Sequence, residues 1–121
     1  MDRILVAEDD AALRLLYTVW LESAGHQVTA VADGRDAIDL IQRRIPEAAV
    51  LDVEMPFVDG LAVSRYLHAL APGVPILVVT ALDGKDAPAA AAGAHGVLSK
   101  PCDRDELVAA VDRLYAALSI V

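Results

Sequence analysis

Short runs of apolar residues recur along the chain at the length of β-strands. They cover residues 4–7, 28–31, 48–51, 76–79 and 97–98. The apolar residues within each run are continuous rather than alternating with polar ones, which is typical of parallel strands buried on both faces. The pattern therefore predicts five strands of a parallel sheet.

Segments of helical length separate these runs. The first ends at Gly25, a typical C-terminal cap, and its predicted apolar stripe consists of Leu13, Leu16, Trp20 and Ala24. We expect Asp10 to cap the N-terminus of this helix. The second helix is predicted after Gly34, with its stripe at Ala37, Ile38 and Ile41.

Three more helices are predicted in the second half of the chain. One follows Asp59 and Gly60 and ends before Pro72, and the next is rich in alanine with Pro88 in its first turn. The last runs from about residue 103 to 118 with Asp103 as its N-cap. A strand followed by a helix, repeated five times, predicts an α/β fold: a doubly wound, five-stranded parallel sheet with five helices, forming a single domain over residues 1–121.

Composition and net charge indicate which kinds of molecule this chain is expected to bind. Hydrophobic residues make up 56% of the chain but aromatic residues only 4%, which suits aliphatic helices packed on a sheet. The formal net charge of −8 repels phosphate backbones, so we expect no direct nucleic-acid binding and look instead to proteins or cations as partners. The sequence shows no signal peptide and no membrane-length apolar run, which favours a cytoplasmic location.

Cysteine and histidine offer little metal chemistry. The single cysteine, Cys102, excludes an internal disulfide and leaves no pair to hold zinc. His26, His68 and His95 lie apart without metal-ligand spacing, and we expect them at the surface or rim of the molecule.

Polar residues follow the predicted strands in a particular pattern. Glu8 and Asp9 come after the first strand, Asp52 after the third, Thr80 after the fourth and Lys100 after the fifth. Because ligands of doubly wound sheets bind at the carboxyl ends of the strands, these side chains should share one rim of the molecule. Taken singly, each also has a structural explanation, as a helix cap or a polar strand end.

Crowded carboxylates disfavour one another's ionisation, so a cluster of this kind calls for a neutralising cation. Mg²⁺ prefers a few carboxylates together with waters and phosphate oxygens. A hydroxyl such as that of Thr80 and an ammonium such as that of Lys100 also stabilise negative charge on a phosphoryl group. The rim is therefore predicted to carry out phosphoryl chemistry with Mg²⁺.

Four motifs in this order, RILVAEDD, LDVEMPFVDG, ILVVTAL and AGAHGVLSKP, span nearly the whole chain. With them the sequence resembles the receiver domain of two-component response regulators. The resemblance implies a flavodoxin-like fold with strand order 2-1-3-4-5. It also implies a sensor histidine kinase or histidine phosphotransfer protein that donates a phosphoryl group to an aspartate, and a domain that assists its own phosphorylation and dephosphorylation rather than an enzyme.

Residue by residue, the resemblance implies Asp52 as the phosphoacceptor, with Thr80 and Lys100 as its partners in the chemistry. It implies Mg²⁺, or Mn²⁺, held by Asp9, Asp52 and the backbone carbonyl of Glu54, with Glu8 acting through water. Three further residues are implied to be structural, namely Pro56 and Gly60 in the turn into the third helix and Pro101 after a cis peptide bond.

The sequence departs from the commoner family pattern at the expected switch. Val97 occupies the position of an aromatic residue that responds to phosphorylation together with Thr80, and a valine has no ring to move. We therefore expect phosphorylation to reorganise the loop after Thr80 and the alanine-rich helix. The changed surface would serve a downstream protein, a covalently linked output domain or a phosphorylation-dependent dimer. A redox role for Cys102, at a helix start that lowers thiol pKa, is a separate hypothesis.

Two other functions remain open at this stage. A receiver-like interaction module would not use phosphate, although every expected site residue is present. An aspartyl-phosphate hydrolase would place a second aspartate two residues after Asp52, where this chain has Glu54.

Overall fold

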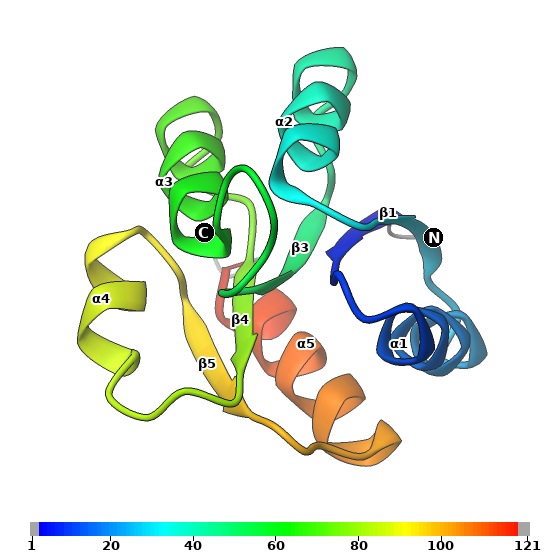
Figure 1. Ribbon diagram of the computed structural model, residues 1–121. Helices are drawn as coiled ribbons and strands as arrows, with labels where there is room; N and C mark the ends of the chain where they lie inside the picture. The colour runs from blue at the N-terminus through cyan, green and yellow to red at the C-terminus, as the bar shows by residue number, and fades with distance from the viewer. Residues whose placement is uncertain (1–2, 119–121) are drawn as a thin grey trace.

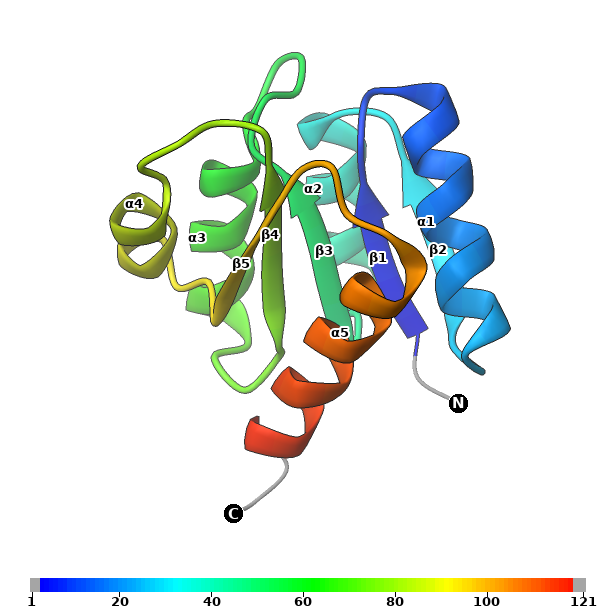
Figure 2. The same cartoon turned by 90° about the horizontal axis from the view of Figure 1, so that it is seen from below.

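A five-stranded parallel sheet forms the centre of the molecule, as the computed structural model of residues 3–118 shows (Figure 1). Its strands are β1 (Arg3–Ala7), β2 (Gln27–Val31), β3 (Ala48–Asp52), β4 (Ile76–Thr80) and β5 (Gly96–Ser99). They lie in the order β2-β1-β3-β4-β5 (Figure 2), which confirms the predicted fold and strand order. The chain turns to opposite sides after β1 and after β3, so the carboxyl ends of these two neighbours form a topological switch point.

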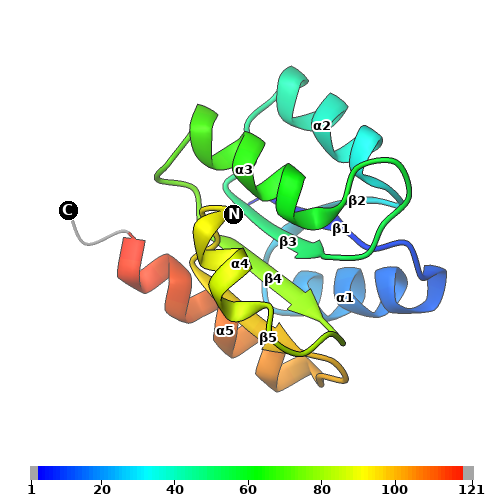
Figure 3. The same cartoon turned by 60° about the vertical axis from the view of Figure 1, so that its left-hand side comes forward.

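Five helices cover the two faces of the sheet. They are α1 (Ala11–Ser23), α2 (Gly34–Arg43), α3 (Gly60–Leu70), α4 (Asp86–Ala91) and α5 (Arg104–Leu118). Helices α1 and α5 share one face, whereas α2 and α3 lie on the other with α4 beside α3 (Figure 3). Within residues 3–118, none of the helices combines the length and the apolar content needed to cross a membrane.

Successive residues of the central strands serve two separate cores. Ile4 and Val6 of β1 join the cluster under α1 and α5, while Leu5 and Ala7 join the cluster under α2 and α3. Each valine, leucine or isoleucine so buried contributes about 1.5–3 kcal/mol to folding. The continuous apolar runs in the sequence therefore reflect a sheet covered on both sides.

Aspartates fix the starts of the helices. Asp10, Asp33 and Asp59 each accept a hydrogen bond from the backbone amide three residues later, at 2.8–3.0 Å. Asp103 and Glu106 accept from each other's backbone amides, at 2.8 and 3.0 Å, and so form a reciprocal cap for α5. The predicted caps at Asp10 and Asp103 are confirmed, and each contributes about 1 kcal/mol.

The predicted apolar stripe of α1 is partly wrong. Tyr17 and Leu21 are the buried residues of this helix, whereas Leu16 is 42% exposed and Ala24 ends the helix as an exposed cap. The helix thus faces the sheet through Leu13, Tyr17 and Leu21, spaced four apart. The helix contains several leucines, so the sequence alone is compatible with more than one buried face.

Strand β2 differs from the expectation of burial on both faces. It lies at the edge of the sheet, where Val28 and Val31 are partly buried and the remaining residues are exposed. A run of apolar residues alone does not distinguish an edge strand from a central one.

The three histidines are partly exposed and also contact neighbouring side chains. The rings of His68 and His95 lie 5.9 Å apart between α3 and the start of β5, and the Nδ1 atom of His95 accepts a hydrogen bond from the Ile76 amide at 3.0 Å. His26 stacks on Tyr115 with ring centroids 5.8 Å apart. All three histidines therefore lie at the rim, as expected, and take part in packing there.

Candidate functional site at the carboxyl rim of the sheet

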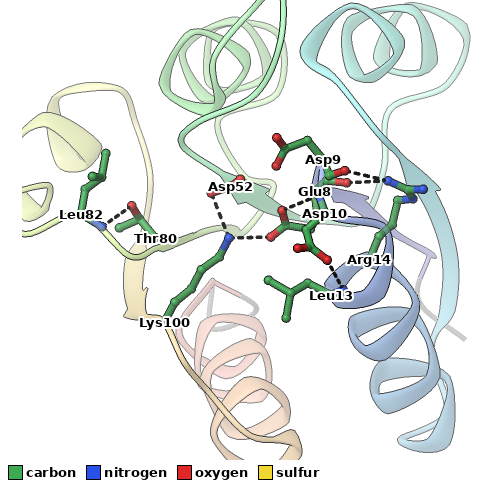
Figure 4. Close-up of polar contacts among 9 residues, drawn as sticks. All are labelled: Glu8, Asp9, Asp10, Leu13, Arg14, Asp52, Thr80, Leu82 and Lys100. Carbon is green, nitrogen blue, oxygen red and sulfur yellow. Dashed lines mark hydrogen bonds and ion pairs between the residues drawn. The ribbon is translucent and has the colours of Figure 1, made fainter.

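The loop after β1 brings two carboxylates to the rim. Glu8 is 1% exposed, and its Oε2 atom accepts a hydrogen bond from the Asp10 amide at 3.1 Å. Asp9 is exposed beside it. Arg14 donates from Nη1 to the backbone carbonyls of Glu8 at 3.0 Å and Asp9 at 3.4 Å (Figure 4).

Arg14 is a site residue that the sequence analysis missed. A cation near the N-terminus of a helix lies at the unfavourable end of the helix dipole. The position of Arg14 in the sequence could have predicted its role, because a cation at this end of a helix needs oxygen atoms as partners. Here those partners are the carbonyls of Glu8 and Asp9.

Asp52 is the last residue of β3 and is 6% exposed. Gly60, the first residue of α3, lies against its backbone: a Cβ atom at Gly60 would be 1.9 Å from the Asp52 carbonyl oxygen. The Gly60 amide also donates to the carbonyl of Val53 at 2.9 Å. The sequence LDVEMPFVDG therefore folds back on itself, with glycine required at the point of closest approach.

Lys100 joins the two acidic segments. Its Nζ atom lies 2.7 Å from Oε1 of Glu8 and 3.3 Å from Oδ1 of Asp52 (Figure 4). The Lys100–Pro101 peptide bond is cis, as the resemblance implied. Lysine thus reaches across the end of β4 from the edge strand β5 to β3 and β1.

Burial and like charge dominate the electrostatics of this site. Burial, together with the negative charge of Glu8, raises the pKa of Asp52 to about 7 against the opposing pull of Lys100. Burial of Lys100 lowers the pKa of its ammonium, but the bonds and charges of Glu8 and Asp52 outweigh it, so the net pKa is raised. Lys100 therefore stays charged, whereas Asp52 loses its proton at a higher pH than an ordinary aspartate does.

The acidic residues fit a hard cation. Carboxylate oxygens of Glu8, Asp9 and Asp52 all lie within 4.8 Å of one another. Hard oxygen donors of this kind suit Mg²⁺ or Mn²⁺, whose positive charge would offset the repulsion that raises the pKa of Asp52. An open hollow adjoins the cluster, and its lining includes Asp9, Glu54 and Pro56.

Thr80 and Val97 lie near this rim without contacting the acidic group. Thr80 ends β4 and is 3% exposed, and its hydroxyl accepts a hydrogen bond from the Leu82 amide at 3.0 Å (Figure 4). Val97 of β5 packs against the small cluster of Val53, Val78 and Ala89 beneath α4. In this structure, Glu8, Asp9, Asp52 and Lys100 come together, while Thr80 is directed toward the loop before α4.

Cys102 does not have the environment of a reactive thiol. Burial raises the pKa of its thiol, and the neighbouring acids Glu106 and Asp103 add to that effect. The pKa of Cys102 is therefore raised rather than lowered, with burial as the largest cause.

Comparison with known proteins identifies relatives along nearly the whole chain. Residues 4–112 match the family described as the response regulator receiver domain. The response regulator MprA of Mycolicibacterium vanbaalenii is 45% identical over 109 residues, which are 88% of this chain and 47% of that protein. MprA of Mycobacterium sp. (strain KMS) is 43% identical over 119 residues, or 97% of this chain and 52% of that protein. The chain thus spans about half the length of the curated relatives it matches.

Solved structures agree with this result. The receiver domain of Francisella response regulator 1452 has a TM-score of 0.88 at 28% identity, with 97% of this chain and 98% of that chain covered. A CheY-like receiver domain protein from Methanospirillum hungatei has a TM-score of 0.93 at 23% identity, covering 98% of this chain and 96% of that chain, and shows the shared fold. Strand order, acidic rim and sequence matches all agree that the chain belongs to the response regulator receiver domain family of two-component signalling.

Proposed function

We propose that Asp52 accepts a phosphoryl group from a sensor histidine kinase or a histidine phosphotransfer protein, in a reaction that depends on Mg²⁺ or Mn²⁺. One observation carries the proposal: a buried carboxylate lies 3.3 Å from a lysine ammonium and beside two more carboxylates, next to an open hollow. The other side chains at this rim are arranged to manage negative charge around Asp52.

The proposed step is a transfer between two nucleophiles. An oxygen of ionised Asp52 attacks phosphorus, the P–N bond to the donor histidine breaks, and the imidazole leaves with the nitrogen's electron pair and takes up a proton. Asp9, Asp52 and the Glu54 carbonyl would hold a bound cation, which would neutralise charge and keep Asp52 ionised. Both oxygens of Glu8 already have partners in Lys100 and the Asp10 amide, which favours a role for Glu8 through water rather than as a direct ligand.

Lys100 and Thr80 have separate parts in this scheme. The ammonium of Lys100 moves from the carboxylate of Asp52 to an oxygen of the incoming phosphoryl group. The Thr80 hydroxyl accepts from Leu82 and keeps its own proton for donation to a second phosphoryl oxygen. Attack by water on the acyl phosphate then returns Asp52 to its starting state, so the domain signals and does not turn over an external substrate.

The signal is proposed to pass through the loop after Thr80 into α4. This helix has six residues and buries Ala89 among otherwise small side chains, so few contacts resist its movement. Val97 has no ring to rotate. We therefore propose that phosphorylation starts the movement of α4 by displacing the hydrogen bond that the Leu82 amide donates to the Thr80 hydroxyl. Its recipient is a downstream protein or a linked output domain, consistent with relatives about twice as long, and a phosphorylation-dependent dimer is a further proposal.

Phosphorylation is tested by incubating the protein with Mg²⁺ and acetyl phosphate, followed by intact-protein mass spectrometry. One phosphoryl adduct is expected on the wild type and on Asp39→Asn, an exposed acid on α2, but none on Asp52→Asn. Absence of an adduct with both acetyl phosphate and a phosphorylated histidine protein would favour the phosphate-independent interaction module. Multiple turnover of phosphate esters would favour the hydrolase.

Movement of α4 is tested by amide hydrogen exchange with and without a phosphoryl mimic. Exchange is expected to change between residues 82 and 97, whereas helix α2, which contributes none of the proposed site residues, serves as an internal control. Unchanged protection across residues 82–97 would refute the proposed route.

A further inference from the structure

The loop that connects β3 to α3 contains a backbone conformation that is rare for its residue. Within residues 3–118, Phe57 is the one residue other than glycine that has a positive φ angle, at 72°. A bulky side chain is unfavourable in this left-handed region. The Val58 amide also donates a hydrogen bond to the Pro56 carbonyl at 2.9 Å, which closes a γ-turn of the uncommon, strained form around Phe57. Contacts from elsewhere in the molecule must therefore hold Phe57 in this conformation.

Burial of the phenyl ring does not supply this support, because Phe57 is 69% exposed. One face of the ring is instead covered by Arg35, whose guanidinium carbon lies 3.5 Å from the ring centroid. A cation placed over an aromatic face is attracted to it. In the part of the chain that the structure describes, no carboxylate forms an ion pair with Arg35. The guanidinium is therefore available to hold the ring.

A second contact joins the same loop to the start of α2 (Figure 3). The Val58 carbonyl lies so close to Gly34 that a Cβ atom there would be 1.9 Å from the carbonyl oxygen. Gly34 and Arg35 are the first two residues of α2. The strained turn is therefore held against the beginning of this helix by one backbone contact and one side-chain contact, and Arg35 provides the latter.

The residues before the turn belong to the candidate site. Glu54 and Pro56 line the open hollow beside the acidic cluster, and the Glu54 carbonyl is a proposed ligand of the cation. Pro56 is also the first residue of the strained turn, so the hollow and the turn share a residue. The other end of this loop is fixed by Gly60 against the Asp52 carbonyl. Because the loop is short and fixed at both ends, the turn restricts the orientation of the Glu54 peptide.

We infer that Arg35 is a positioning residue for the acidic centre: it stacks on Phe57, holds the strained turn and so fixes the Glu54 peptide whose carbonyl is a proposed cation ligand. The part of the inference that concerns the cation rests on the proposed function. Two effects of Arg35 on a bound cation have opposite signs. Loss of its positive charge alone strengthens cation binding, whereas relaxation of the turn weakens it.

The Kd for Mg²⁺ separates these two effects, and it is measured from amide NMR shifts during a titration without any phosphoryl donor. Arg35→Gln is expected to raise the Kd by about fivefold, the lower end of ordinary coupling between two sites. Arg43→Gln removes the same charge from the exposed last turn of α2 and should not raise the Kd. Arg35→Lys keeps a cation for the ring and should recover part of the affinity. An unchanged or lower Kd in Arg35→Gln would overturn the positioning role.

Two substitutions of Phe57 test the contribution of backbone strain. Glycine adopts a positive φ without a side-chain penalty, so Phe57→Gly should keep the wild-type Kd for Mg²⁺. Adding Arg35→Gln to Phe57→Gly should then have no further effect, because the turn no longer needs the stack. Phe57→Ala keeps the unfavourable conformation and loses the ring, so it should raise the Kd about as much as Arg35→Gln does. Equal Kd values for the alanine and glycine variants would overturn the argument from strain.

The melting temperature in a chelator tests the turn without any cation. Arg35→Gln should lower it by about 2–4 °C in the wild-type chain, but by less than about 1 °C in the Phe57→Gly chain. Equal losses in the two chains would overturn the contact with Phe57 as the role of Arg35. If the wild type binds no Mg²⁺, the proposed cation site fails and the positioning role fails with it, while the melting temperatures still decide whether Arg35 holds the turn.

Discussion

Asp52 should destabilise the metal-free fold at neutral pH, and Asp52→Asn should relieve this. Its pKa of about 7 compares with 3.8 for an ordinary aspartate, a difference that corresponds to about 4 kcal/mol. Because the folded pKa lies above the unfolded one, the neutral carboxyl favours folding fully below pH 3.8, and this contribution is lost as pH rises to about 7. Asparagine keeps the shape without the charge, so the variant should gain about 2–4 kcal/mol at pH 8, part of it offset by the loss of one partner of Lys100.

Urea denaturation in a chelator measures this difference. The advantage of Asp52→Asn should grow by about 3 kcal/mol between pH 5 and pH 8, because the carboxyl ionises across that interval. Asp39→Asn removes the same charge from an exposed site on α2 and should change stability by less than about 0.5 kcal/mol. A stability gain that does not vary with pH, or a loss at pH 8, would refute the assignment of the strain to buried charge.

Other expected outcomes concern the cation, a glycine and a helix cap. Mg²⁺ should raise the melting temperature of the wild type at neutral pH but not that of Asp52→Asn, as followed by differential scanning fluorimetry; an equal shift in both would point to a different site. Gly60→Ala should cost about 2–4 kcal/mol in urea denaturation, since its Cβ atom would meet the Asp52 carbonyl oxygen, whereas Gly73→Ala has open space and should cost under about 1 kcal/mol. Asp10→Ala should lose about 1 kcal/mol with the N-cap of α1 and Asp10→Ser should recover most of it; equal losses would argue against capping.

Hydrophobic pattern predicted most of the fold because central strands and helix caps depend on local sequence. The runs around Val6, Val50 and Val78 are apolar on both faces, and the observed strands cover them. The sequence does not show which strand lies at the edge of the sheet. Val28 and Val31 look like core residues in the sequence, but they belong to the edge strand β2. The face of α1 was also ambiguous, because leucines and aromatic residues alternate around the helix.

The acidic centre was predictable for a related reason. In a parallel sheet, the residues that end the strands must meet at one rim, so Glu8, Asp9, Asp52 and Lys100 could be grouped before any distance was known. Contacts that depend on side-chain direction were not predictable. One such contact is the hydrogen bond from the Leu82 amide to the Thr80 hydroxyl, and another is the hydrogen bond from Arg14 to a loop carbonyl. Both depend on side-chain rotamers, which the patterns of strands and helices do not determine.

The ion pairs of Lys100 with Glu8 and Asp52 can form only after the last strand of the sheet has folded. The pair with Glu8 connects a residue that follows the last strand with one that follows the first. Until β5 has joined the sheet, the carboxylates of Glu8 and Asp52 have no such counter-charge, and bringing them together is unfavourable. A chain that is still emerging from the ribosome without β5 therefore lacks the assembled group of Glu8, Asp52 and Lys100, and we expect it to be unable to carry out the proposed phosphoryl transfer.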